Sequence, residues 1–166
     1  MKWKTKVNVR ARKLTLLINT MGWTAAQGKR LGLEKSILEK YFPNRVNWIN
    51  PTSNTNAKID ASFESNSGRR YTMRVYIPND FPSSCPNMVI KEPASRIPDF
   101  PNLRTSHAGP RNHEGYLLIC HFDKSKWSGQ HTLYEVLMKG RLWLEAYEGH
   151  LSTGNEIDYY LKHMGE

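Results

Sequence analysis

Apolar positions near the beginning of the chain predict a helix over residues 24–42. They approximate one helix face, because residues three or four apart lie above one another on a helix. These positions are Leu31, Ile37, Leu38 and Tyr41. Thr24 with Gln27 three residues later has the form of a capping box at the start of the helix, and Pro43 ends it.

A longer apolar stripe near the end of the chain predicts a second helix. Thr132 and Glu135 form another capping box before it, and Gly154 lies just past its end. The stripe consists of Leu133, Val136, Leu137, Gly140, Trp143 or Leu144, Tyr147 and Leu151. Because these residues share one face, we expect the helix to pack against the core.

Between the two helices, the period of the apolar residues changes to that of strands. Tyr71–Ile77 alternates apolar and polar residues, which is typical of a half-buried strand. Val46–Ile49 and Ile59–Phe63 are β-like pieces joined by a turn rich in Asn, Ser and Thr, so we expect a hairpin. Asn87–Lys91 is a further short strand.

Residues 78–110 contain seven of the nine prolines of the chain. These are Pro78, Pro82, Pro86, Pro93, Pro98, Pro101 and Pro110. Since proline fixes φ and cannot donate a ladder hydrogen bond, we expect rigid, irregular coil around the strand at Asn87–Lys91. A long ordered loop of this kind is usually functional.

The order of these elements indicates an α+β fold in a single domain over residues 1–166. It comprises an N-terminal helix, an antiparallel meander of three or four strands, a proline-rich loop and a long C-terminal helix. A chain of 166 residues with 39% hydrophobic residues can bury a core without a second domain.

The net charge of +9 is carried by residues 1–50, which hold eleven Lys and Arg against two acidic residues. Six of these basic residues fall within the first thirteen positions, so about residues 1–20 form a basic arm. Such an arm favours an acidic partner surface or a phosphate backbone, and a solvated tail is the alternative. A nucleic-acid-binding role is less favoured, because aromatic and basic residues are not interleaved as a stacking platform requires.

Two cysteines, Cys85 and Cys120, are too few for a disulfide framework, and no Cys-x-x-Cys pair suggests zinc. The apolar run behind the basic arm, over residues 14–18, is too short for a signal-peptide core or a membrane span. We therefore expect a cytoplasmic protein with no membrane segment, no metal and no other cofactor.

Cys120 lies in the most distinctive stretch of the chain, Gly115–Trp127. The apolar run Tyr116–Ile119 leads directly to the thiol, and mostly polar residues follow it. This pattern predicts that the upstream scaffold delivers the thiol to a surface. A lone cysteine after an apolar run is more often inert packing, and that interpretation stays open.

Three segments together resemble the ubiquitin-conjugating enzymes, over roughly residues 30–155. The pair Phe81-Pro82 follows a strand that ends in proline, and another proline and an apolar strand come after it. Cys120 with Trp127 seven residues later is similar to the active-site signature of that family. The last helix more specifically resembles bacterial members of the fold that are encoded with cyclic-oligonucleotide antiphage signalling systems, through Trp143-Leu144, Tyr147-Glu148 and Thr153-Gly154.

The resemblance implies a cysteine-dependent transferase of antiphage defence. Cys120 would accept the C-terminal acyl group of a ubiquitin-like protein, or of a cyclic-nucleotide synthase, as a thioester and pass it to an amine of a target protein. The chain has neither Gly-x-Gly-x-x-Gly nor Gly-x-x-x-x-Gly-Lys, so a separate activating enzyme would carry out any adenylation. An inactive module of the same fold that only binds partners is the alternative.

The sequence departs from the family at its His-Pro-Asn motif, which is absent here. Asn112, eight residues before Cys120, and a loop histidine, His107 or His113, are the candidates for groups that assist the transfer. His121 is a poor candidate for the base, because adjacent side chains of an extended chain face opposite sides.

Two further sites are weighed and ranked low. A metal site that combines Cys120 with His107 or His113 lacks the four ligands that structural zinc normally requires. Cys85 has no positively charged neighbour in sequence to lower its pKa, so we expect it to be incidental.

Overall fold

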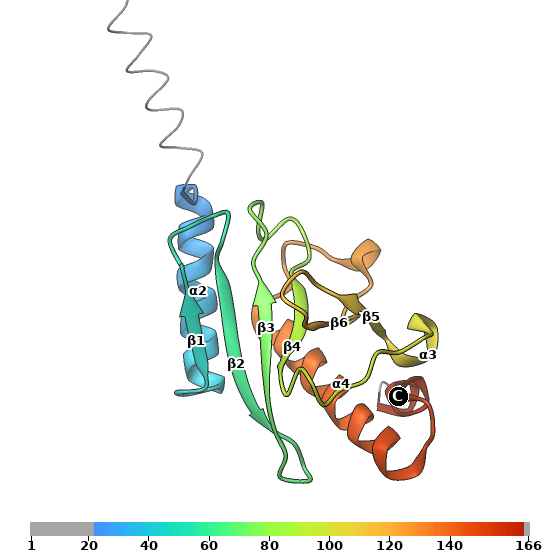
Figure 1. The fold of residues 1–166 in the computed structure, drawn as a ribbon. Helices are drawn as coiled ribbons and strands as arrows, with labels where there is room; N and C mark the ends of the chain where they lie inside the picture. The colour runs from blue at the N-terminus through green and yellow to red at the C-terminus, as the bar shows by residue number, and fades with distance from the viewer. Residues whose placement is uncertain (1–21, 165–166) are drawn as a thin grey trace, which may run out of the picture.

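The computed structural model describes residues 22–164 of the chain, so the predicted basic arm lies outside the described residues. The described residues form an α+β fold, in which helix α2 is followed by an antiparallel six-stranded sheet and then by helices α4 and α5 (Figure 1). The predicted α+β class is confirmed. None of the described helices is both long and apolar enough to cross a membrane.

Helix α2 (Ala25–Tyr41) begins at the predicted capping box. The Gln27 amide donates to the Thr24 hydroxyl oxygen at 3.2 Å, and the Thr24 amide donates back to the Gln27 side chain at 3.1 Å. The predicted apolar face is only partly right, because Tyr41 is 53% exposed. Glu34 is instead fully buried on this face, where Arg30 pairs with it at 2.8 Å.

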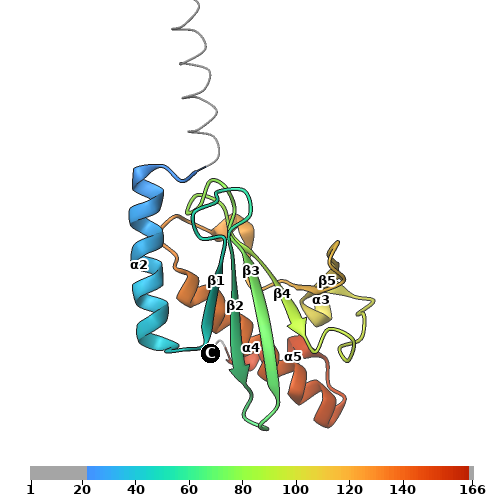
Figure 2. The same ribbon diagram turned by 60° about the vertical axis from the view of Figure 1, so that its left-hand side comes forward.

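The first four strands follow one another in the sheet as the meander that the sequence predicts. They are β1 (Val46–Ile49), β2 (Lys58–Glu64), β3 (Arg70–Tyr76) and β4 (Asn87–Glu92). In β3, alternate residues are buried, which confirms the predicted period of two. Helix α2 runs alongside β1 in both views (Figures 1 and 2).

The prediction of three or four strands is wrong, because two more strands extend the sheet. These are β5 (Ala108–Arg111) and β6 (Leu117–Ile119), and the order is β1-β2-β3-β4-β6-β5. β5 contains Pro110, which an edge strand tolerates because one side of it has no ladder partner. All three residues of β6 are apolar, so its sequence shows no alternation, although its burial alternates. A short helix, α3 (Leu103–Ser106), precedes β5.

Helix α4 (Leu133–Thr153) starts at the predicted capping box and ends at Gly154, which adopts a left-handed φ of 79°. Its Gly140 lies against the sheet so closely that an added Cβ would come within 2.7 Å of the Met73 and Met88 side chains. The predicted stripe is buried up to Tyr147, whereas Leu151 is 49% exposed. The last turn of α4 has therefore passed beyond the sheet.

Helix α5 (Ile157–Met164) was not predicted from the sequence. It turns back beside the end of α4 and also contacts α3 (Figures 1 and 2). Ile157 is buried, and the Tyr160 ring lies about 2.9 Å from where a Cβ on Gly149 would be. α5 thus brings C-terminal residues next to the segment that leads into β5.

The face of the sheet opposite α4 carries a network of charged side chains. Arg74 donates two hydrogen bonds to Asp60, at 2.7 and 2.8 Å, and Lys91 donates a third at 2.9 Å. Burial alone would raise the pKa of Asp60, but the hydrogen bonds from these two cations outweigh it and lower the pKa. Glu114 extends the network to the Tyr76 hydroxyl.

Candidate functional site

The Cys120 thiol is exposed at the point where β6 ends. Leu117 and Ile119 are buried and fix the strand in the sheet, so the chain leaves the sheet at the next residue. The Cys120 amide donates to the His107 carbonyl at 2.7 Å, and this bond continues the β5–β6 ladder by one residue. Cys120 is therefore not a buried packing residue.

A groove of about 630 Å³ lies beside the thiol. His107 and residues 120–124 form one wall of it. Helix α4 contributes Lys139, Leu142 and Trp143, and helix α5 contributes Leu161. The groove is thus built from four separate parts of the chain, and Cys120 is one of the residues that line it.

His107 is held at this groove by a carboxylate from α5. Its Nε2 lies 2.7 Å from Asp158 Oδ1, and Lys162 donates to the other oxygen of Asp158 at 2.6 Å. The hydrogen bonds from His107 and then from Lys162 lower the pKa of Asp158. Residue 107 itself caps α3 with a left-handed φ of 50°, a conformation that His adopts more readily than most residues.

His121 also lines the groove, but its ring is held by other contacts. Its Nδ1 lies 3.3 Å from the Ile119 carbonyl oxygen, and its Nε2 lies 3.9 Å from the Cys85 sulfur. Burial is the main cause that lowers the pKa of His121 to about 4. A ring that is neutral and packed in this way is poorly suited to accept protons at the thiol.

Cys85 is half-buried, and burial raises the pKa of its thiol more strongly than nearby Lys124 lowers it. A thiol with a raised pKa is a poor nucleophile at neutral pH. Of the two cysteines, the geometry therefore favours Cys120.

Asn112 and His113 lie at the turn between β5 and β6, at the end of this hairpin remote from Cys120. The Asn112 side-chain oxygen accepts hydrogen bonds at 3.0 Å from the amides of Glu114 and Tyr116. Its amide group donates to the Tyr76 hydroxyl at 2.7 Å. Asn112 thus braces the turn, and of the four predicted site residues only His107 and Cys120 line the same groove.

The segment after the thiol is tied to the rest of the molecule through Trp127 and Arg30. The Trp127 indole donates to the Pro82 carbonyl at 2.9 Å, which joins two motifs that the sequence analysis singled out. Arg30 donates to the carbonyls of Gly129 and His131, at 2.5 and 2.6 Å. These bonds fix the path of the chain between the thiol and α4.

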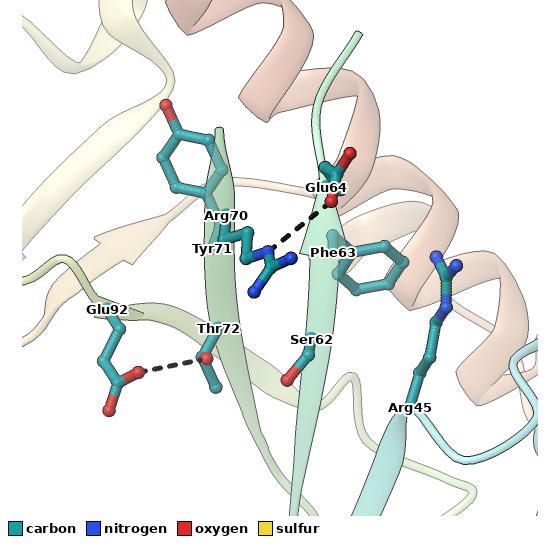
Figure 3. Close-up of a pocket in the computed structure, with 8 residues that line it drawn as sticks. All are labelled: Arg45, Ser62, Phe63, Glu64, Arg70, Tyr71, Thr72 and Glu92. Carbon is teal, nitrogen blue, oxygen red and sulfur yellow. Dashed lines mark hydrogen bonds and ion pairs between the residues drawn. The ribbon is translucent and has the colours of Figure 1, made fainter. Parts of the chain in front are cut away.

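A second pocket, of about 460 Å³, lies on β2 and β3 (Figure 3). An ion pair between Arg70 and Glu64 and a hydrogen bond from Thr72 to Glu92 cross it. It contains neither Cys nor His, so it offers no comparable nucleophile. Among residues 22–164, no three His, Cys, Asp or Glu side chains are placed to hold a metal ion together.

Asp158 is the residue of this site that the sequence analysis missed. A signal was present, because Ile157, Tyr160 and Leu161 have the spacing of one helix face directly after Gly154. That pattern predicts a short helix folding back after α4. It does not reveal that the helix would reach a histidine 51 residues earlier in the chain.

Comparisons of the chain with models of known protein families, with curated proteins and with solved structures find no match.

Proposed function

We propose that this protein is a conjugating enzyme of the ubiquitin-conjugating type, and that Cys120 carries the C-terminal acyl group of another protein as a thioester. The observation that carries the proposal is the exposed Cys120 thiol, which opens into a groove that also contains His107. The donor is a ubiquitin-like protein or a cyclic-nucleotide synthase of an antiphage system, as the resemblance in sequence implies.

The transfer takes place in two steps at the sulfur. The Cys120 thiolate attacks the activated carboxyl carbon of the donor, a carbon–sulfur bond forms, and the activating group leaves with its bonding electrons. A lysine amine of the acceptor then attacks the same carbon, and the carbon–sulfur bond breaks to regenerate the thiolate. Sulfur suits this role, because a thiolate is both a good nucleophile and a good leaving group.

His107 is the group that can assist the second step. Asp158 engages Nε2, so Nδ1 is the ring nitrogen that remains to accept the proton that the attacking amine loses. The Asp158 carboxylate also stabilises the imidazolium that forms. This pair substitutes for the assisting groups of the absent His-Pro-Asn motif.

Expression together with the genomic neighbours of this protein tests the proposal. On non-reducing gels we expect an adduct of higher mass that a reducing agent removes. Cys120→Ser should replace it with an oxygen ester that survives the reducing agent and is cleaved by hydroxylamine. Cys85→Ser is the matched control and should retain the reducible adduct.

The same experiment separates a transferase from a module that only binds partners. If the protein is only a binding module, the Cys120→Ala variant should still co-purify with the partner. The wild-type protein should then form no covalent adduct. A reducible adduct that persists in Cys120→Ala would contradict the assignment of the thiol.

A further inference from the structure

Two lysines that line the Cys120 groove, Lys124 and Lys139, have no acidic partner among the described residues. Lys139 lies over the Phe122 ring, with Nζ 4.7 Å from its centre, and Lys124 donates to the Asn87 side-chain oxygen at 3.2 Å. Within residues 22–164, neither lysine takes part in an ion pair. Both positive charges are therefore available to a ligand of the groove.

Asp123 is the one carboxylate among the described residues that line the groove. It accepts hydrogen bonds from the amide and hydroxyl of Ser125, at 3.0 and 2.7 Å, and lies 3.9 Å from the Lys126 ammonium. Its charge is thus already engaged within its own turn. The groove presents a net positive charge close to the thiol.

The groove also has apolar lining residues. Leu142 is 39% exposed, and Phe122, Trp143 and Leu161 line the groove beside it. An exposed leucine next to an aromatic ring favours an apolar side chain of a ligand. The apolar residues and the two lysines line the same groove, so a single extended peptide can contact both.

We propose that the donor tail of the thioester carries acidic and apolar side chains just before its terminal acyl group, and that Lys124 and Lys139 select the acidic ones. This inference rests on the proposed function, because it assumes that the tail reaches Cys120. Charge complementarity favours this occupant, since a basic tail would place like charges beside both lysines. Two partly exposed ion pairs correspond to a preference of about tenfold for an acidic tail over a basic one.

Two synthetic peptide thioesters test the preference without an activating enzyme. Both carry the same 2-mercaptoethanesulfonate leaving group, and their tails are Leu-Glu-Leu-Glu-Gly-Gly and Leu-Lys-Leu-Lys-Gly-Gly. The Cys120 thiolate attacks the peptide carbonyl, a new carbon–sulfur bond forms, and the mercaptoethanesulfonate leaves as a thiolate. The initial rate of loading of the full chain is followed by intact mass.

We expect the acidic tail to load about tenfold faster than the basic tail in dilute buffer, and the ratio to shrink at high salt. Lys124→Glu/Lys139→Glu should invert the preference. Lys29→Glu/Lys35→Glu changes the net charge equally at exposed sites on α2, and it should leave the ratio unchanged. This control separates the groove from the attraction of a chain with net charge +9.

The outcomes distinguish the two proposals. If neither peptide loads Cys120 faster than it loads free cysteine, the proposed function fails. If both load Cys120 at equal rates, or if the control variant shifts the ratio as much as the groove variant, the acidic-tail inference fails while the carrier thiol stands.

Discussion

Cys120 and His121 are adjacent in sequence and both line the groove, but Cys120 is exposed whereas His121 is partly buried and lies against Cys85. From the alternation of side chains along an extended chain, the sequence analysis predicts that His121 is a poor base for the thiol. It could not choose between His107 and His113, because that choice depends on Asp158, which lies far away in sequence. Neighbouring residues predict the local path of the chain, but they do not predict a hydrogen-bond partner that lies far away in sequence.

The partly buried His121 predicts a pH dependence of stability. Its pKa falls from 6.5 to about 4 on folding, so the unfolded chain binds this proton more tightly. The stabilisation that comes from holding His121 neutral in the folded chain is therefore fully present above about pH 6.5. It is lost as the pH falls towards 4. Between pH 7.5 and pH 5, the wild type should lose about 2 kcal/mol more than His121→Asn.

Urea unfolding of both proteins at these two pH values measures the difference. Carboxylates such as Asp60 and Asp158 also contribute to the pH dependence of stability. Both proteins retain them, so their contributions cancel in the comparison. Equal losses in the two proteins would show that the folded chain does not hold His121 neutral.

The pair of His107 and Asp158 predicts a defect confined to the second transfer step. His107→Ala should load Cys120 from a peptide thioester normally and discharge it to a small amine about a hundredfold more slowly, as expected when a general base is lost. Asp158→Asn should show a smaller defect, because the carboxylate that holds the histidine ring through Nε2 is then replaced by an amide. Single-turnover discharge followed by intact mass provides both rates.

Glu92→Gln serves as a surface control, since this exposed carboxylate lies on β4 and does not line the groove. Normal discharge by His107→Ala would remove the histidine from the mechanism.

At the scale of the elements, the two long helices and the four strands of the meander were predicted, including the four-residue β1, whereas β5, β6 and α5 were not. The seven residues of β3 alternate between buried and partly exposed positions over most of the strand. The 21 residues of α4 repeat the helical spacing several times, and the capping box of Thr132 and Glu135 marks its start. β5, β6 and α5 have four, three and eight residues, so each carries at most two turns or two alternations. Their positions depend on contacts with the rest of the sheet and with α4.

The buried Glu34 predicts that α2 and α4 are coupled in stability. Its carboxylate accepts the Leu133 amide at 2.8 Å, at the start of α4, and it pairs with Arg30. Glu34→Ala leaves the buried amide unsatisfied and Arg30 unpaired, so we expect a loss of about 3 kcal/mol in the free energy of unfolding.

Glu39→Ala on the same helix is the matched control, because Glu39 is exposed. It should change stability by less than about 0.5 kcal/mol. Urea denaturation of the two variants measures the difference, and similar midpoints would argue against the coupling of the helices.

At the scale of the whole molecule, the site is a meeting point of segments that are remote in the chain. The thiol comes from the end of β6, His107 from the end of α3, and the opposite wall from α4 and α5. The sequence identified the thiol through its local pattern and its resemblance to a family. It did not indicate the groove, because α5 and the β5–β6 hairpin that shape it were not predicted.

The charge of the molecule is also unevenly distributed with respect to the site. All of the basic excess belongs to residues 1–50, whereas Lys124 and Lys139 belong to residues 51–166, which have no net charge. The positive charge of the groove is therefore a local feature that the composition of residues 51–166 does not reveal.

The central claim is that Cys120 carries an acyl group, and the mass of the adduct isolated with its natural partner tests it most directly. The account predicts a mass equal to the chain plus the donor protein less one water, with the link on the peptide that contains Cys120. Hydroxylamine at neutral pH should release both proteins. An unmodified Cys120 peptide, with any added mass on Cys85 or on a lysine alone, would contradict the account.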